Sequence, residues 1–369
     1  MEYKLLGGGI LVHQKSLNEL GEAEAVIFDC DGTIIDSTKS YYLTDKVAAC
    51  IILEKLYGLR IYLGRDLDDV LFRLDMLGGF NNDWHKTSLV IQALLLHSET
   101  SGKKVGVNLG PVDHVEEYIE RCSVKESFPE DVKAGVAWLI KKISENYGRF
   151  MSLGDFEKLV DTEAEKIGKA EQIKDARKTL GPLTSYGSGL LTTLYDELFL
   201  GEEGIRRRYG VDPRYVSWGG MLDREELLIS QETLRKLEEI VPKGLAIATG
   251  RGRWETEKSL KTLIKYFNLE ASIFAADLPG EFEKPDARML IECSKRLNAR
   301  RVIYVGNSLE DLLLVKNAVK HGVKALFIGV LTNPYAFDHF IRDQADAIID
   351  EVNLLPKVLE RKNSFWKPI

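Results

Sequence analysis

A short apolar stretch near the amino terminus ends in two closely spaced acids. The sequence of Val26–Thr33 is VIFDCDGT, and its three leading apolar residues predict a short buried strand. Side chains at positions i and i+2 of an extended chain point to the same side, so Asp29 and Asp31 share one side of the strand end. Gly32 allows a sharp turn after them. Because open α/β sheets place ligands at the carboxyl ends of their strands, this stretch predicts a ligand site.

Three interpretations of this stretch compete. The simplest is an acidic turn that follows a strand. A calcium loop would place Asp29, Asp31 and Thr33 at positions one, three and five. That loop requires Gly at position six and Glu at position twelve, where the chain has Ile34 and Ser40, so it is excluded. The third interpretation is a carboxylate nucleophile beside a carboxylate acid/base, which needs partners elsewhere in the chain.

The composition is that of a globular protein with more than one ordinary core. Its 369 residues, 44% of them hydrophobic, predict one large domain with an insertion, or two domains. The net charge of −7 argues against a general nucleic-acid or anionic-membrane binder. No signal pattern occurs, and no apolar run approaches the roughly 20 residues of a membrane span. The four scattered cysteines are typical of a reducing cytosol, so we expect a cytoplasmic protein.

Two kinds of pattern divide the chain. Between residues 40 and 240, apolar residues recur at spacings of three and four, as in Val132, Val136, Leu139 and Ile143, which predicts helices. From about residue 244, short apolar runs (GLAIAT, ASIFAA, RVIYVG, KALFIG and DAIID) alternate with helical patterns. The predicted fold class is therefore α/β, with a Rossmann-like doubly wound parallel sheet core. A large, mostly helical domain is inserted after the first strand.

These patterns predict three segments. The sheet domain is discontinuous and comprises residues 22–37 and 243–369, because the first strand is too isolated to be stable alone. The helical insertion covers residues 38–242, and an amino-terminal extension covers residues 1–21. The extension contains LLGGGILVH, which could form a hairpin. A phosphate loop is not supported there, because no Gly-Lys-Ser/Thr sequence follows the glycines.

Two later segments carry polar residues of complementary type. GLAIATGR ends in Thr249 and Gly250, a hydroxyl and a flexible backbone amide that can hold a phosphoryl oxygen, and Arg251 and Arg253 follow. A threonine in this position is equally good as a helix N-cap. The sequence EKP places Lys284 before a proline that suits the first turn of a helix. A lysine in such a place is otherwise a solvated surface residue.

A last strand end, in VIYVGNSLEDLL, carries Asn307, Glu310 and Asp311 at a strand-to-helix turn. Acids in a first helical turn are also ordinary complements of the helix dipole. Taken together and in order, the motifs DxDGT, hhhTG, KP and GNxxxD resemble those of the haloacid dehalogenase (HAD) superfamily. The resemblance covers the whole sheet domain, and its first motif is highly specific.

The resemblance implies a role for each motif residue. Asp29 would attack phosphorus and form an aspartyl-phosphate, while Asp31 would act as general acid and then as general base. Thr249 and Lys284 would bind the transferring phosphoryl oxygens. The dehalogenases lack the second acid because halide needs no protonation, so Asp31 favours phosphoryl transfer. The implied substrate-binding positions of the sheet domain are Gly32, Gly250 and Arg251.

The implied cofactor is Mg²⁺, held between Asp29, the backbone carbonyl of Asp31 and the loop that carries Asn307 and Asp311. Family phosphatases usually have an aspartate where this chain has Asn307. An asparagine coordinates through its carbonyl oxygen but brings no charge, so we expect weaker Mg²⁺ binding. The departure also leaves open a degenerate site without activity.

The insertion resembles the helical caps of the superfamily, which close over the site and select the substrate, although it is larger than usual. GGFNNDW, at residues 78–84, resembles a cap signature of a poorly characterised, largely prokaryotic subgroup of HAD phosphatases. Its Asn81 and Asn82 are candidate substrate contacts, although a helix–helix turn with Asn or Asp caps explains the segment equally well. Arg73 could reach a substrate anion or a surface carboxylate. The polar, glycine-rich segment 184–189 is a further candidate.

The sequence therefore predicts a cytoplasmic, Mg²⁺-dependent phosphatase of a small phosphorylated metabolite, with no nucleic-acid or membrane partner. A phosphomutase, in which the aspartyl-phosphate is returned to a sugar, is one alternative. A non-catalytic HAD-like protein that binds a ligand or regulates a partner is the other.

Overall fold

The chain forms two compact units. The computed structural model describes residues 2–61, 64–80, 82–98, 106, 108–123, 130–278, 280, 282 and 284–360. Unit 1 comprises Met1–Ser37 and Glu226–Ile369, and unit 2 comprises Thr38–Glu225. The chain therefore leaves unit 1 once, builds unit 2 and returns. Residues 226–242, which the sequence patterns assign to the insertion, belong to unit 1.

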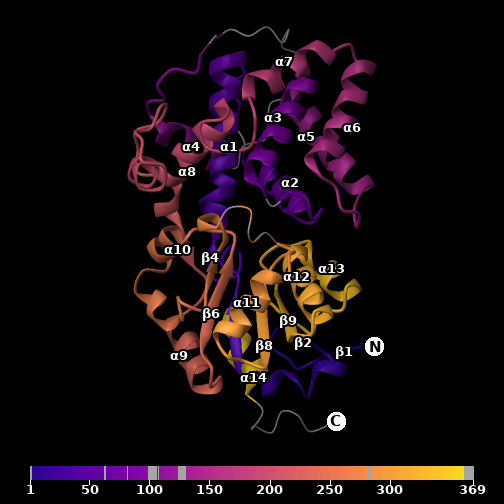
Figure 1. Ribbon diagram of the computed structural model, residues 1–369. Helices are drawn as coiled ribbons and strands as arrows, with labels where there is room; N and C mark the ends of the chain where they lie inside the picture. The colour runs from indigo at the N-terminus through magenta and orange to yellow at the C-terminus, as the bar shows by residue number, and fades with distance from the viewer. Residues whose placement is uncertain are drawn as a thin grey trace. The chain divides into compact units, whose positions relative to one another are not determined.

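Within the described residues, unit 1 is built on an eight-stranded sheet of order β1-β2-β10-β9-β8-β3-β6-β7 (Figure 1). Its strands are β1 (Tyr3–Leu5), β2 (Ile10–His13), β3 (Ala25–Phe28), β6 (Leu245–Thr249), β7 (Ile273–Phe274), β8 (Arg301–Gly306), β9 (Lys324–Val330) and β10 (Ala347–Ile349). The pairs from β10 to β7 are parallel, as the sequence predicts. The hairpin of β1 and β2 joins β10 in antiparallel pairing. A separate antiparallel ribbon pairs β4 (Ile35–Asp36) with β5 (Glu226–Leu227).

Strand β3 lies inside the sheet, although it is early in the sequence. Its four residues are fully buried, which fits a parallel strand covered on both faces. Phe28 is in register with Val305 of β8 on one side and with Ile247 of β6 on the other. The residues that follow these three strands consequently reach the same edge of the sheet.

Helices of unit 1 alternate with its strands. They are α9 (Gln231–Ile240), α10 (Arg253–Leu260), α11 (Arg288–Arg296), α12 (Leu309–Lys320), α13 (Ala336–Arg342) and α14 (Leu355–Leu359). Helix α11 packs against β3, β6 and β7, and α12 packs against β8 and β9. Helices α9 and α14 form another contacting pair. This alternation, with a large helical region inserted after the early strands, confirms the predicted α/β fold class.

Unit 2 is helical throughout its described residues. Its helices are α1 (Tyr41–Tyr57), α2 (Arg65–Asp75), α3 (Asp83–His97), α4 (Val115–Ser123), α5 (Glu130–Glu145), α6 (Leu153–Lys166), α7 (Ala170–Leu180) and α8 (Leu190–Tyr209). Helix α3 packs against α1, α5, α6, α7 and α8, and it is buried from Lys86 to Leu96. Unit 2 thus has a core of its own around α3. In neither unit does a described helix have both the length and the apolar character needed to cross a membrane.

Candidate active site

The polar residues that follow β3, β6 and β8 lie together in unit 1. The backbone N–H of Asp29 donates to the carbonyl of Val305 at 2.9 Å, which extends the β3–β8 ladder by one residue. Thr249 ends β6, and Asn307 follows the last residue of β8. The predicted site residues that unit 1 contains are Asp29, Asp31, Gly32, Thr249, Gly250, Arg251, Lys284, Asn307 and Asp311.

A buried lysine bridges two carboxylates at this edge. Lys284 Nζ lies 2.6 Å from Asp29 Oδ1 and 2.8 Å from Asp311 Oδ1. The three side chains are 7%, 8% and 0% exposed. Since a buried charge is tolerated only when it is paired, the lysine and the two acids stabilise one another. The cluster therefore holds a cation against the carboxylate that would act as nucleophile.

The pKa values of this cluster reflect burial and charge together. Burial raises the pKa of Asp29 from 3.8 to about 7; Lys284 opposes the rise, while Asp311 and Asp31 add to it. Burial would lower the pKa of Lys284, but Asp29 and Asp311 outweigh that effect and raise it well above its usual value. Lys284 is consequently charged. Its positive charge favours the ionised form of Asp29, which burial disfavours.

Asp311 uses both of its carboxylate oxygens. Oδ2 accepts from the backbone N–H groups of Asn307 and Ser308, both at 3.1 Å, and from Ser308 Oγ at 2.8 Å. Oδ1 accepts from Lys284 and lies 3.2 Å from the hydroxyl of Tyr304, which also lies 2.9 Å from the carbonyl oxygen of Ala248. Asp311 therefore shapes the turn after β8 and holds Lys284 in place.

Asn307 is oriented by Thr332. The hydroxyl of Thr332 donates its single proton to the carbonyl of Gly32, so it accepts from Asn307 Nδ2, 3.1 Å away. The amide oxygen of Asn307 then points away from Thr332. Gly32 has φ +64°, and a Cβ there would lie 2.0 Å from Asn307 Nδ2. Glycine is thus required at position 32 for two reasons. Its φ is positive, and a side chain there would collide with Asn307.

Asp31 is held by Arg251. Nε of the arginine donates to both oxygens of Asp31, at 2.9 and 3.0 Å, and Nη2 donates to Oδ1 as well. The side chain of Arg251 is completely buried, whereas that of Asp31 is 33% exposed. One edge of the acid is therefore fixed by the protein and another edge is open to solvent.

Thr249 is the last residue of β6, and Gly250 and Arg251 follow it. Thr249 is fully buried, and its hydroxyl accepts from the backbone N–H of Arg251 at 3.3 Å. Gly250 is exposed, and no atom lies within 4 Å of the place a Cβ would take. The backbone at Gly250 is thus open to a ligand, while the threonine hydroxyl supports the turn.

The residues at this edge form a set of oxygen donors that suits a hard cation. Asp29 supplies a carboxylate, Asp31 a backbone carbonyl and Asn307 an amide oxygen, and Mg²⁺ prefers oxygen ligands of these kinds. Asp311 accepts four hydrogen bonds and also contacts the Tyr304 hydroxyl, so its carboxylate is held by the turn and by Lys284. Among the described residues, no three His, Cys, Asp or Glu side chains gather as a metal site. The donor set therefore fits Mg²⁺ with one carboxylate, neutral oxygens and water.

The candidate residues of unit 2 have partners within that unit. Arg73 pairs with Asp69 at 2.8 Å, and the side chain of Asn82 caps α3 by accepting from the N–H of His85. Asn81 lies outside the described residues. Trp84 Nε1 donates to Asp196 at 2.9 Å. Arg73, Asn82 and Trp84 thus each have a partner within unit 2, and their contact with a substrate stays a prediction.

The neighbouring glycine and aromatic residues of the segment GGFNNDW are also packed. Phe80 is fully buried and makes an edge-to-face contact with Phe156, with ring centroids 5.4 Å apart. A Cβ on Gly79 would lie 2.3 Å from the carbonyl oxygen of Met151. In the segment 184–189, Ser188 Oγ donates to carbonyl oxygens of the same loop. Both segments are therefore built into the core or turns of unit 2.

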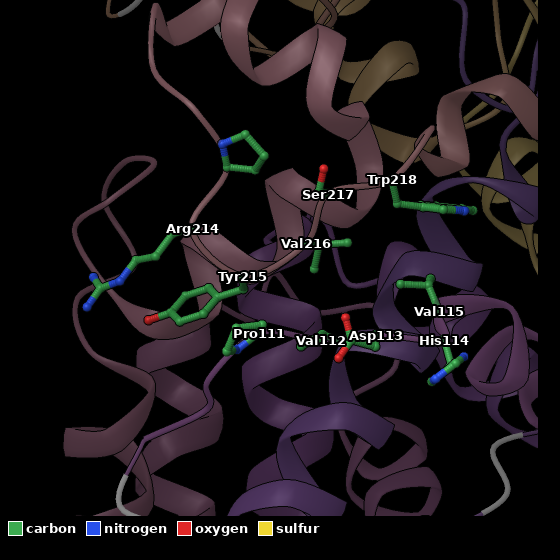
Figure 2. Close-up of a pocket in the computed structure, with 11 residues that line it drawn as sticks. Pro111, Val112, Asp113, His114, Val115, Arg214, Tyr215, Val216, Ser217 and Trp218 are labelled. Atoms are coloured by element: carbon green, nitrogen blue, oxygen red, sulfur yellow. The ribbon is translucent and has the colours of Figure 1, made fainter.

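Unit 2 also contains a cavity of about 430 Å³ (Figure 2). Its lining comes from segments 111–115 and 213–218, which are joined by a 2.7 Å hydrogen bond from Val112 N–H to the carbonyl of Tyr215. None of the residues predicted from the sequence lines this cavity.

Two residues of the site were not predicted. Thr332 follows β9 and orients Asn307. Thr332 is a polar residue that follows the apolar run KALFIG, as Thr249 ends the run GLAIAT. The same reasoning could therefore have indicated it. Tyr304 lies inside β8, where an aromatic residue predicts only a buried strand. No sequence signal indicated that its hydroxyl reaches Asp311.

Comparisons with known proteins find similar folds among solved structures. Neither the family models nor the curated proteins include a match. Among solved structures, a Northeast Structural Genomics Consortium target is similar with a TM-score of 0.54 and 19% identity, over 91% of this chain and 98% of that one. Phosphatase Tt82 from Thermococcus thioreducens has a TM-score of 0.49 and 17% identity, over 87% and 100%.

A HAD-superfamily hydrolase from Geobacter sulfurreducens is similar with a TM-score of 0.37 and 12% identity, over 91% of this chain and 96% of that chain. Of the last two neighbours, one is a phosphatase and the other a HAD-superfamily hydrolase. At such identities the similarity is one of fold. The predicted α/β fold, with a large helical region inserted after the early strands, is confirmed.

Proposed function

We propose that this HAD-like fold is a Mg²⁺-dependent phosphatase of small phosphorylated metabolites that works through an aspartyl-phosphate on Asp29. The observation that carries the proposal is the buried bridge of Lys284 between Asp29 and Asp311, at 2.6 and 2.8 Å. This bridge places the charged ammonium group of Lys284 beside the carboxylate of Asp29, at the ends of parallel strands. The second acid, Asp31, lies two residues away and is fixed by Arg251.

In the first step, a carboxylate oxygen of Asp29 attacks phosphorus in line with the ester bond. The new P–O bond to Asp29 forms as the bond from phosphorus to the leaving oxygen breaks. Asp31 gives its proton to that oxygen, so the alcohol leaves neutral. Lys284 and the backbone N–H groups around Gly250 stabilise the charge of the transferring phosphoryl oxygens.

In the second step, Asp31 accepts a proton from water as the water oxygen attacks phosphorus. The bond between phosphorus and Asp29 breaks, which releases phosphate and restores both acids to their starting states. A Mg²⁺ ion held by Asp29, the backbone carbonyl of Asp31 and Asn307 would neutralise part of the phosphoryl charge. Thr332 supports this ligand set because it fixes which face of the Asn307 amide carries the oxygen.

The proposal is tested by phosphate release from p-nitrophenyl phosphate with and without Mg²⁺. We expect turnover that EDTA abolishes and that Asp29→Asn reduces by roughly 10⁴-fold or more, as removal of a nucleophile does. Asp338→Asn is the matched control, because Asp338 is an exposed acid of the same unit. Turnover that survives Asp29→Asn contradicts the assigned nucleophile. Wild-type protein without turnover on any phosphoester contradicts the proposed activity, and isomerised product without free phosphate identifies a mutase.

A further inference from the structure

We propose that Arg251 is a positioning residue, which fixes the acid/base carboxylate of Asp31 and does not bind the substrate. The proposal rests on the proposed function, because it assigns a role within the same reaction. It also replaces the substrate contact that the sequence motif TGR implied for this arginine.

Arg251 and Asp31 form a pair of restricted geometry. A guanidinium is planar and presents its N–H donors as a fork that matches a carboxylate. Arg251 uses this fork on Asp31, with Nε 2.9 and 3.0 Å from the two oxygens and Nη2 bonded to Oδ1. A paired carboxylate of this kind is restricted in both its position and its rotation.

The guanidinium of Arg251 is also anchored on the side that faces away from Asp31. Nη1 of Arg251 donates to Ser259 Oγ at 3.2 Å. The hydroxyl of Ser259 in turn donates to the carbonyl of Glu255 at 2.9 Å, within α10. The arginine therefore connects Asp31 to a helix. An arginine held in this way restricts the movement of Asp31 relative to α10.

The burial of Arg251 also separates it from the substrate. The side chain of Arg251 is 0% exposed, so a substrate phosphate would reach it only if the protein moved. Moving the arginine toward solvent would leave Asp31 without its partner. Arg253 provides the contrast, because its side chain is 45% exposed and pairs with Glu257 of α10 at 2.8 Å. Arg251, in the turn after β6, and Arg253, the first residue of α10, thus have opposite environments.

This role predicts a characteristic dependence on the leaving group. An alkoxide leaves only with a proton, so hydrolysis of an alkyl phosphate needs Asp31 in the first step. p-Nitrophenolate leaves without a proton, so only the second step, in which water loses a proton, needs Asp31. Loss of Arg251 would therefore lower kcat for alkyl phosphates and leave KM almost unchanged. A substrate-binding arginine would instead raise KM for both substrates.

The experiment compares wild type, Arg251→Met, Arg251→Lys and the control Arg253→Met on p-nitrophenyl phosphate and on glycerol phosphate. We expect Arg251→Met to lower kcat for glycerol phosphate by roughly 10²-fold or more, the size of a general acid–base contribution. With p-nitrophenyl phosphate we expect a burst of one nitrophenolate per site, followed by slow turnover. Arg253→Met should behave like wild type.

A double-mutant cycle separates positioning from any other role. If Arg251 acts through Asp31, Arg251→Met should cost nothing further in an Asp31→Asn background. Equal additional losses in both backgrounds, or a KM raised about tenfold or more for both substrates, overturn the proposal. If Arg251→Met does not fold, the same kcat, KM and cycle measurements on Arg251→Lys decide, because lysine keeps the charge but lacks the fork. Wild-type protein without turnover removes the proposed function, whereas active wild type with a KM effect removes the positioning role alone.

Discussion

Each unit contains a buried lysine that bridges two aspartates. In unit 1, Lys284 lies 2.6 and 2.8 Å from Asp29 and Asp311. In unit 2, Lys86 lies 2.7 Å from Asp83 and 2.9 Å from Asp75. The two lysine side chains are 7% and 6% exposed. The acids differ more, because Asp75 and Asp83 are 23% and 18% exposed and Asp29 and Asp311 are 8% and 0% exposed. A buried, paired lysine alone therefore does not distinguish a reactive site from a structural one.

The clusters differ in where their members come from. Asp75 ends α2, and Asp83 and Lys86 belong to the first turn of α3, so Lys86 joins neighbouring helices. Asp29 follows β3, and Asp311 belongs to α12, which follows β8. The second acid, Asp31, is held by Arg251 at the same edge of the sheet. An ion pair between helices mainly fixes packing. The same pair at the ends of parallel strands lies where a ligand can reach it.

The largest expected effect comes from removing each lysine. Lys284→Met and Lys86→Met should both lower the free energy of unfolding, by about 3–5 kcal/mol, because each leaves two acids without their buried partner. Only Lys284→Met should lower kcat, by roughly 10²-fold or more, since a donor to the phosphoryl oxygens is lost. Denaturant unfolding and kcat per folded molecule measure the two effects. Loss of kcat in Lys86→Met at full folding would remove the distinction between the clusters.

A second test uses the raised pKa of Asp29. The carboxyl has a pKa of about 7 in the folded protein and 3.8 as its ordinary value, so between these values the folded state retains a proton that the unfolded state has lost. Stability from this group therefore falls as pH rises from about 4 to about 7, by at most about 1.4 kcal/mol per pH unit. In EDTA, the Tm of wild type should decline relative to that of Asp29→Asn across this window and then level off. A Tm difference independent of pH would contradict the buried, proton-binding state.

A third test concerns carboxylates that hold backbone N–H groups. Asp311 accepts two in unit 1, and Glu197 of unit 2 accepts three, from Arg214, Tyr215 and Val216 at 2.6, 2.7 and 2.9 Å. Glu197→Gln should lower the free energy of unfolding by about 2–3 kcal/mol, because charge-assisted hydrogen bonds are lost. Its kcat should be unchanged. Asp311→Asn should lower both stability and kcat, and equal kcat in the two variants would contradict the different roles.

The smallest expected effect is at Asn307. Asn307→Asp adds a charge to the donor set and should tighten Mg²⁺ binding by about tenfold, or about 1.4 kcal/mol. Calorimetric titration of the substrate-free protein with Mg²⁺ measures this affinity, and Asn317→Asp in α12 is the control. An unchanged Mg²⁺ affinity would count against Asn307 as a ligand.

The sequence predicted the parts of the site that depend on strand ends. Parallel strands in register bring their carboxyl ends to one edge, so Asp29, Thr249 and Asn307 could be grouped without any knowledge of side-chain contacts. The outcome for Arg251 could not be predicted in the same way. It and Arg253 are equivalent in sequence, and only packing against α10 determines which one turns inward.

Two other expectations also depend on packing that local sequence does not encode. Helix α9 has an amphipathic pattern that is the same whether it covers a sheet or other helices, so residues 226–242 were assigned to the wrong unit. The sequence GGFNNDW combines Gly, Asn and Asp in a way that suits both a helix cap and a binding loop. The contacts of Phe80 and Trp84 within unit 2 favour the structural function, and those contacts are not encoded in local sequence.

The central claim is that Asp29 carries the phosphoryl group, and chemical trapping tests it most directly. Enzyme, Mg²⁺ and an alkyl phosphate are mixed, quenched during turnover and treated with borohydride, which reduces an acyl phosphate to an alcohol. Mass spectrometry should then find homoserine at position 29, and it should be absent without substrate and in Asp29→Asn. Turnover with an unmodified Asp29, or with homoserine at another position, would contradict the account.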